Sequence, residues 1–150
     1  MSKDKFTMTS YKEVVRDGTT EEFKLFNYQD LGDIRTFIDD EERTWICLDD
    51  ICKILNLGSP KSISTKIDKA WVSSVVIENH TKDEKLTFVY EAGVGTILFF
   101  SKKARIINFR RWLFREALEA LVKEKKKRIE MLENLKAENE RLKEKLLSKE

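Results

Sequence analysis

The sequence has few of the residues that form disulfides, interrupt helices or commonly take part in catalysis. Cysteine occurs only at 47 and 52, proline only at 60 and histidine only at 80. Two cysteines with a C-x4-C spacing and one distant histidine do not form a zinc-site pattern, so we expect Cys47 and Cys52 to be buried thiols in a reducing compartment. A histidine–carboxylate or cysteine–histidine pair close in sequence and a phosphate-binding glycine loop are also absent. We therefore expect no enzyme activity, catalytic residue, metal or cofactor.

Long apolar runs are also missing. The longest apolar cluster, Thr96–Phe100, is far too short to span a bilayer. The first ten residues, MSKDKFTMTS, lack the apolar core of a signal peptide. We expect a cytoplasmic protein, or a nuclear one if the host is eukaryotic.

Basic residues are scarce in the first 100 residues and concentrated in the last 50. Residues 1–100 carry 13 Lys+Arg and 18 Asp+Glu, a balance of −5, whereas residues 101–150 carry 16 and 9, a balance of +7. A basic end on an acidic body is typical of a localised site for a polyanion or a protein partner. For residues 123–150 alone, a solvated helix face explains the charge equally well.

The most basic stretch also has a helical pattern. Between Lys102 and Arg115 there are six basic residues and no acid, and no glycine or proline follows Gly95. A helix from about Lys102 would place three arginines in one sector and an apolar arc opposite. The arginines are Arg105, Arg111 and Arg115, and the arc is Ile106, Phe109, Leu113, Ala117, Leu118 and Leu121. Arg110 projects from the apolar arc, so we expect it either to pair with an acid, with Asp49 and Asp50 as the first candidates, or to lie at the margin of the core.

The rest of the chain predicts an α+β fold of small antiparallel sheets with short helices, followed by a long C-terminal helix. Residues 1–21 are polar and aperiodic and are expected to form a flexible arm. Residues 22–122 form the domain, and residues 123–150 the helical extension. Expected strands are 23–28, 33–38, 44–47, 72–77 and 85–90. A helix capped by Asp49 or Asp50 and one starting at Pro60, which carries Lys61 and Lys66, follow the third strand. A short apolar helix at 91–100 uses Gly93 and Gly95 for close packing, and His80 lies in a surface turn.

From Leu118 onward apolar residues follow a heptad pattern. The seam is interrupted at Lys125 and Arg128 and regular over five positions: Leu132, Leu135, Asn139, Leu142 and Leu146. Glu138 and Lys143, and Lys145 and Glu150, are complementary pairs for two identical parallel chains. Asn139 at a seam position also favours two parallel strands. We expect a parallel homodimer through this coiled coil; the alternative is a single solvated helix.

The run from Phe23 to about Val122 resembles the Bro-N domain of baculovirus-repeated-ORF proteins and prophage antirepressors. The matching segments are residues 45–55 (WICLDDICKIL), 90–93 (YEAG), 101–104 (SKKA) and 108–112 (NFRRW). The resemblance implies an α+β module of phage and large-virus regulators that is generally regarded as DNA-binding. Family members commonly end the tryptophan-containing helix with Leu-Pro. Here Leu118 is followed by Glu119, so the helix can continue into the heptads.

Two functions remain open. The first is a dimeric DNA-binding regulator whose phosphate contacts come from a set of basic residues: Lys102, Lys103, Arg105, Arg111 and Arg115, with Lys61 and Lys66 as second contacts. The second is an antirepressor that binds a repressor protein without touching DNA, which the acidic charge of residues 1–100 favours. Salt-dependent binding to duplex DNA distinguishes the two.

Overall fold

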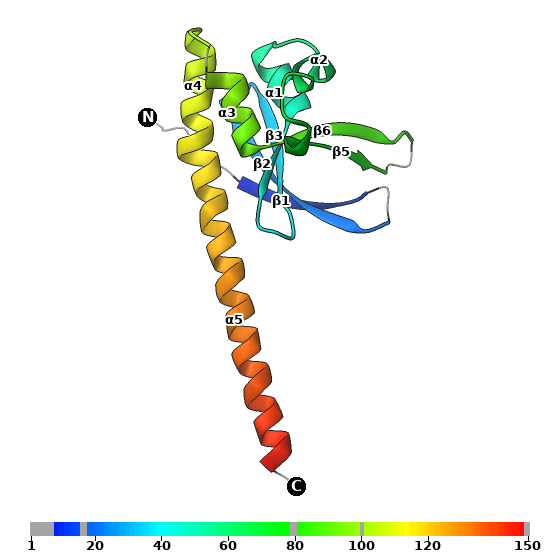
Figure 1. The fold of residues 1–150 in the computed structure, drawn as a ribbon, viewed down its shortest axis with the longest axis vertical. Helices are drawn as coiled ribbons and strands as arrows, with labels where there is room; N and C mark the ends of the chain where they lie inside the picture. The colour runs from blue at the N-terminus through cyan, green and yellow to red at the C-terminus, as the bar shows by residue number, and fades with distance from the viewer. Residues whose placement is uncertain (1–7, 16–17, 79–80, 100, 149–150) are drawn as a thin grey trace.

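A six-stranded antiparallel sheet forms the body of the protein, and a long helix runs past it (Figure 1). The structure, a computed structural model, describes residues 8–15, 18–78, 81–99 and 101–148. The strand order is β1-β2-β3-β4-β6-β5. The strands are β1 (Met8–Val14), β2 (Thr20–Tyr28), β3 (Gly32–Ile38), β4 (Thr44–Cys47), β5 (Val72–Ile77) and β6 (Glu84–Tyr90). Because β4 pairs with β6, the expected small sheets are one sheet.

The sheet curls until its two edges touch. Val15, after β1, forms an antiparallel bridge with Ile77 at the end of β5, and the Glu78 N–H donates to the Val14 carbonyl oxygen. The curl gives the sheet an inner and an outer face, each with its own apolar cluster. The inner cluster is Phe23, Phe37, Trp45, Cys47, Ile77, Leu86 and Phe88. The outer cluster, which includes Phe26, Ile34 and Ile46, packs against the helices.

The first strand corrects one expectation. Residues 8–14, expected to lie in a flexible arm, form β1 and pair with β2 from Met8–Phe26 to Val14–Thr20. An edge strand with one solvated face needs few apolar residues, so its polar sequence did not reveal it. Residues 1–7 and His80 lie outside the described residues.

Within the described residues, three short helical segments lie between β4 and β5, and a fourth follows β6. They are α1 (Leu48–Leu55), α2 (Pro60–Ser64), a 3-10 turn (Lys69–Trp71) and α3 (Glu91–Phe99). The N-cap of α1 is Cys47, which makes no side-chain capping bond, so the expected cap at Asp49 or Asp50 is wrong. Both aspartates lie in the first turn and bind the sheet instead. Ser59 caps α2, with Pro60 in its first turn as expected.

The C-terminal helix runs from Ala104 to Ser148 and changes its hydrogen bonding once. It consists of α4 (Ala104–Trp112), a π-helical turn (Leu113–Ala117) and α5 (Leu118–Ser148). In the π turn the Leu118 N–H bonds to the carbonyl oxygen of Leu113, five residues back. This wider turn keeps Leu113, Ala117 and Leu118 all buried. All six residues of the predicted apolar arc are buried, and the helix begins at Ala104, two residues later than expected.

The α+β fold predicted from the sequence is confirmed. The β4 and β5 bounds agree with the expected strands, and those of β2, β3 and β6 differ by one to three residues. Gly93 lies where an added Cβ would approach Val89 Cγ1 to 2.5 Å, so α3 packs on β6 only because this residue is glycine. Among the described residues, no helix combines the length and apolarity needed to cross a bilayer.

Candidate nucleic-acid interface

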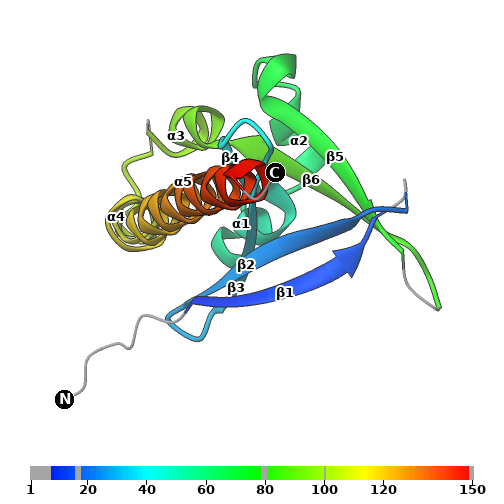
Figure 2. The same cartoon turned by 90° about the horizontal axis from the view of Figure 1, so that it is seen from below.

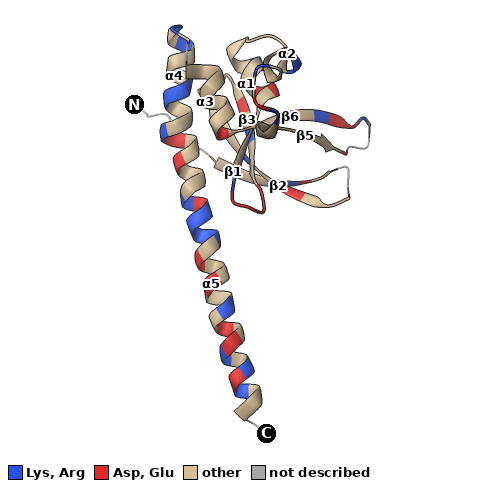
Figure 3. Cartoon of the chain, viewed as in Figure 1, with Lys and Arg blue, Asp and Glu red and all other residues tan. Residues whose placement is uncertain are grey.

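Two stretches without a single acidic residue meet at the helical end of the domain. The first is residues 51–67, which contain most of α1 and all of α2. The second is residues 92–115, which contain most of α3 and all of α4. We call this surface the acid-free end. Its basic residues are Lys53, Lys61, Lys66, Lys102, Lys103, Arg105, Arg110, Arg111 and Arg115. In Figure 3 the tops of α2 and α4 carry blue and no red.

Specific contacts hold the two stretches together. Arg105 on α4 donates from Nε and Nη2 to the carbonyl oxygen of Leu55, at 3.3 and 3.1 Å. This carbonyl belongs to the last turn of α1, where helix carbonyls lack intrahelical partners. Ile63 on α2 and Ile97 on α3 line one groove between these two helices. The acid-free end is therefore one packed unit of four helices.

The expected phosphate contacts divide into two groups. Lys61, Lys66, Lys102, Lys103, Arg111 and Arg115 are exposed, and within the described part of the chain their side chains have no ion-pair or hydrogen-bond partner. Arg105 is also exposed, but two of its N–H donors are bonded to the carbonyl oxygen of Leu55. Lys66 lies just beyond α2, which ends at Ser64, and not on it as expected. The structure thus leaves six cations free to meet an anion and uses the seventh for packing.

Arg110 does not pair with an aspartate. Its Nη1 donates to the carbonyl oxygens of Leu98 at 3.1 Å and Phe99 at 3.0 Å, and its guanidinium lies over the Phe99 ring. The prediction of a carboxylate partner is wrong because two carbonyls at the end of α3 satisfy the charge at the margin of the core. Arg110 therefore ties α4 to α3, as Arg105 ties α4 to α1.

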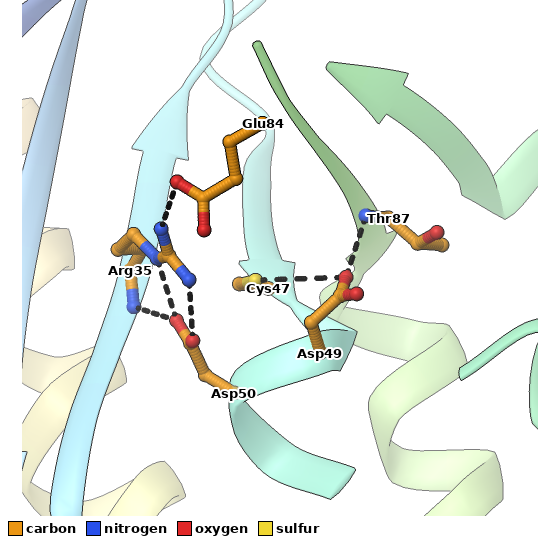
Figure 4. Close-up of polar contacts among 6 residues, drawn as sticks. All are labelled: Arg35, Cys47, Asp49, Asp50, Glu84 and Thr87. Carbon is orange, nitrogen blue, oxygen red and sulfur yellow. Dashed lines mark hydrogen bonds and ion pairs between the residues drawn. The ribbon is translucent and has the colours of Figure 1, made fainter. Parts of the chain in front are cut away.

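Asp50, the partner proposed for Arg110, binds Arg35 on β3 (Figure 4). Its Oδ1 accepts from Arg35 Nη2 at 2.8 Å, and its Oδ2 accepts from Nε at 3.0 Å and from the Arg35 backbone N–H at 2.9 Å. Asp50 is 8% exposed, and its hydrogen bonds raise the pKa of the Arg35 guanidinium further. Glu84 accepts from Arg35 Nη1 at 3.2 Å. Nothing in the sequence spacing pairs residues 35 and 50, so this clamp was missed.

Asp49, the residue before Asp50, fixes α1 to β6, which lies across β4 from β3. Its Oδ1 accepts from the Thr87 N–H on β6 at 2.7 Å and from the Cys47 thiol at 3.9 Å (Figure 4). Desolvation by burial raises the pKa of the Cys47 thiol strongly, and that of Cys52 to about 11. Two adjacent aspartates thus hold the start of α1 between β3 and β6, which positions the acid-free end on the sheet.

The acidic side chains gather elsewhere. The β3–β4 turn carries Asp39, Asp40, Glu41 and Glu42, and β2 starts with Glu21 and Glu22. In Figure 3 this red turn lies below the sheet, away from α2 and the top of α4. Although desolvation works the other way, hydrogen bonds from Trp45 and Arg43 lower the pKa of Asp39. The domain therefore has opposite charges at opposite ends.

The seam residues on α5 lie beyond the domain. Leu132, Leu135, Leu142 and Leu146 are 50 to 68% exposed, so in the single chain they contact no core. Contact between α5 and the sheet ends nearer the start of α5, where Lys24 pairs with Glu124 at 3.5 Å and Arg128 is half-buried. The structure contains one chain and so leaves the coiled coil as a prediction.

Comparisons with known proteins bear on the family of the chain. The chain is 27% identical over 124 residues to an uncharacterized protein of Haemophilus influenzae. The aligned region covers 82% of this chain and 57% of that protein, so the chain spans little more than half the length of this relative. No solved structure matches the chain. Residues 33–119, more than half of the chain, match the family described as the BRO family, N-terminal domain (Bro-N), and the chain therefore belongs to the BRO family.

Proposed function

We propose that the protein is a DNA-binding regulator of the phage or viral type, and that its acid-free end contacts the phosphates of a duplex. The observation that carries the proposal is the set of six exposed, unpartnered cations around four packed helices: Lys61, Lys66, Lys102, Lys103, Arg111 and Arg115. The family match supports the same function. Each phosphate that a fixed cation neutralises releases counterions, which favours binding at low salt.

The proposal depends on rigidity as well as on charge. Lys102 and Lys103 precede α4, which Arg105 ties to α1 and Arg110 ties to α3. An ordered cation loses less conformational entropy on binding than one on a mobile segment. The acidic turn at the far end would be repelled by DNA, so the charge separation also sets the direction of approach.

The test is fluorescence anisotropy of a labelled duplex at several salt concentrations. Single reversals of Lys61, Lys102, Arg111 and Arg115 to Glu should each weaken binding and lower the salt slope by about one unit per chain. Lys85→Glu is a matched control because Lys85 is an exposed lysine on β6, outside the acid-free end. Arg105 is left out, since its reversal would also remove the bonds to Leu55.

The rival function is binding of a repressor protein without DNA. It is supported by the net acidity of residues 1–100 and by the acids gathered on the sheet. It expects no wild-type binding to duplex DNA at moderate salt. Wild-type binding that none of the four reversals changes would remove the acid-free end from the proposal.

We also propose that the regulator acts as a homodimer through Leu132, Leu135, Asn139, Leu142 and Leu146. The support is the exposure of the four leucines on a helix that projects past the domain. The g and e charges and Asn139 favour a parallel pair on sequence grounds. Sedimentation of the full chain and of a chain ending at Arg128 tests the dimer, because only the full chain should be dimeric.

A further inference from the structure

Two aromatic side chains are exposed in the part of the chain that the structure describes, and both belong to the acid-free end. Phe99, the last residue of α3, is 66% exposed, and Phe114, in the π turn, is 39% exposed. Every other aromatic residue in the described ranges is buried or half-buried. Apolar side chains scattered singly over a surface are ordinary, whereas a group of them marks a place of contact.

The contacts between α3 and α4 place the two rings on one strip of surface. A Cβ added to Gly95, one turn before Phe99, would lie 3.9 Å from Phe114 Cζ. Arg110, one turn before Phe114, donates to the carbonyl oxygen of Phe99 at 3.0 Å. The two helices therefore lie side by side here, and both views show α3 beside the start of the long helix (Figures 1 and 2). The strip consists of Phe99, Arg110 and Phe114, and we call it the aromatic strip.

Arg110 fixes the position of Phe99 on this strip. Its Nη1 binds the carbonyl oxygens of Leu98 and Phe99, so the backbone at the end of α3 is tied to α4. Its guanidinium carbon also lies 5.8 Å from the centroid of the Phe99 ring. The ring nevertheless keeps two thirds of its surface in solvent. Phe99 is thus an exposed flat side chain on a backbone that cannot easily yield.

The charges around the aromatic strip favour a polyanion as its partner. The exposed cations Lys102, Lys103, Arg111 and Arg115 lie in the same stretch, 99–115, which contains no acid. A protein partner covering the strip would have to desolvate the lysines, which are depleted from the cores of protein interfaces. Nucleic acid supplies phosphates for the cations and flat apolar bases for the rings.

We propose that Phe99 enters between two base pairs of the bound duplex as a wedge and kinks it. Apolar side chains, phenylalanine among them, partly unstack a base step in this way and bend DNA by about 20–90°. The bonds from Arg110 hold the wedge in place against the stacked bases, and the exposed cations nearby bind phosphates on either side of the opened step. This inference rests on the duplex binding proposed above and adds a deformation that phosphate contacts alone do not produce.

A wedge at Phe99 also selects among DNA sequences. Pyrimidine–purine steps such as TA and CA unstack easily, whereas A-tracts are stiff. The cost of inserting the ring therefore depends on the step that is opened, even where no side chain hydrogen-bonds to a base. We expect duplexes with a central TA or CA step to bind more tightly than A-tract duplexes of the same length.

The test measures the bend of a duplex that carries a donor dye at one end and an acceptor dye at the other, with the full chain at saturating concentration. Wild-type protein should raise the energy transfer on the TA duplex. Phe99→Ala should still bind but leave the duplex straight, and Phe99→Trp should restore the bend. The alanine variant keeps the Arg110 bonds, because these go to backbone carbonyls. Leu31→Ala is the matched control, since Leu31 is 64% exposed and lies between β2 and β3, outside the acid-free end.

Bending by the wild-type, Phe99→Trp and Leu31→Ala proteins, together with its loss in Phe99→Ala, supports the wedge. The preference for the TA duplex should disappear in the same variant. A duplex that wild-type protein binds without bending overturns the wedge and leaves the phosphate contacts standing, and so does a bend that persists in Phe99→Ala. Absence of duplex binding by wild-type protein overturns both the wedge and the proposed function.

Discussion

Arg105 and Leu55 lie fifty residues apart in the sequence and share two hydrogen bonds, at 3.3 and 3.1 Å. The guanidinium fork of Arg105 closes the end of α1 with a group from the start of α4. The acid-free end keeps its shape because of this contact, and the cations around it keep their spacing. Arg105 therefore holds α4 against α1, while its remaining hydrogen-bond donors stay available.

The first prediction separates the two adjacent arginines of α4. Arg110→Ala should lower the free energy of unfolding by about 2 kcal/mol, because two carbonyl oxygens at the end of α3 lose a charged donor. Arg111→Ala is the matched control and should change stability by less than about 0.5 kcal/mol, since Arg111 is exposed and unpartnered. Urea unfolding measures both. Equal losses would show that the Arg110 bonds contribute nothing net.

The second prediction concerns the two glycines of α3. Gly93→Ala should destabilise by about 1–3 kcal/mol, because the added Cβ would meet Val89 Cγ1 at 2.5 Å and Ile67 Cγ2 at 3.1 Å. Gly95→Ala should stabilise by about 0.5–1 kcal/mol, since its nearest neighbour is Phe114 at 3.9 Å and alanine favours a helix. Thermal unfolding of the pair gives the sign directly, and a Gly93→Ala protein as stable as wild type would contradict the packing.

The third prediction tests the clamp on α1. Asp50→Ala should cost about 3 kcal/mol, because it leaves the Arg35 guanidinium and backbone N–H without their buried partner. Asp40→Ala removes an exposed acid from the β3–β4 turn and should be nearly neutral. Because α1 positions the acid-free end, Asp50→Ala should also weaken duplex binding, even though the loss of one negative charge by itself favours binding to DNA. Unaltered or tighter binding would mean that the clamp serves stability alone.

The fourth prediction is a pH dependence. Burial raises the pKa of Cys52 to about 11 and that of Cys47 strongly, so the folded protein keeps both protons where the unfolded chain loses them. Stability should therefore fall as pH rises above about 9, where unfolded thiols ionise. A thiol reagent at pH 8 should react with urea-unfolded protein and hardly with native protein. Rapid reaction of the native protein would place a thiol at the surface.

How much the sequence revealed depended on how far apart the interacting residues lie. Alternating residues of one strand predict that strand, and the apolar arc of α4 and α5 predicted every buried position. Arg110 was misassigned because periodicity gives the direction of a side chain and not the identity of the atom it reaches. Likewise β1 was missed because a polar edge strand is ordered by its hydrogen bonds to β2 and not by an apolar pattern of its own. The ion pair of Arg35 with Asp50 was missed because it forms only once folding brings β3 and α1 side by side.

The π turn at Leu113–Ala117 holds one residue more than an ordinary α turn. Removing one residue there, so that the turn becomes an α turn, would leave everything downstream facing as it does now. Removing one residue from the regular helix between Leu121 and Leu132 would instead rotate the exposed leucines of α5 by about 100° relative to the sheet. The same one-residue deletion is therefore silent at one place in the long helix and redirects its leucines at another.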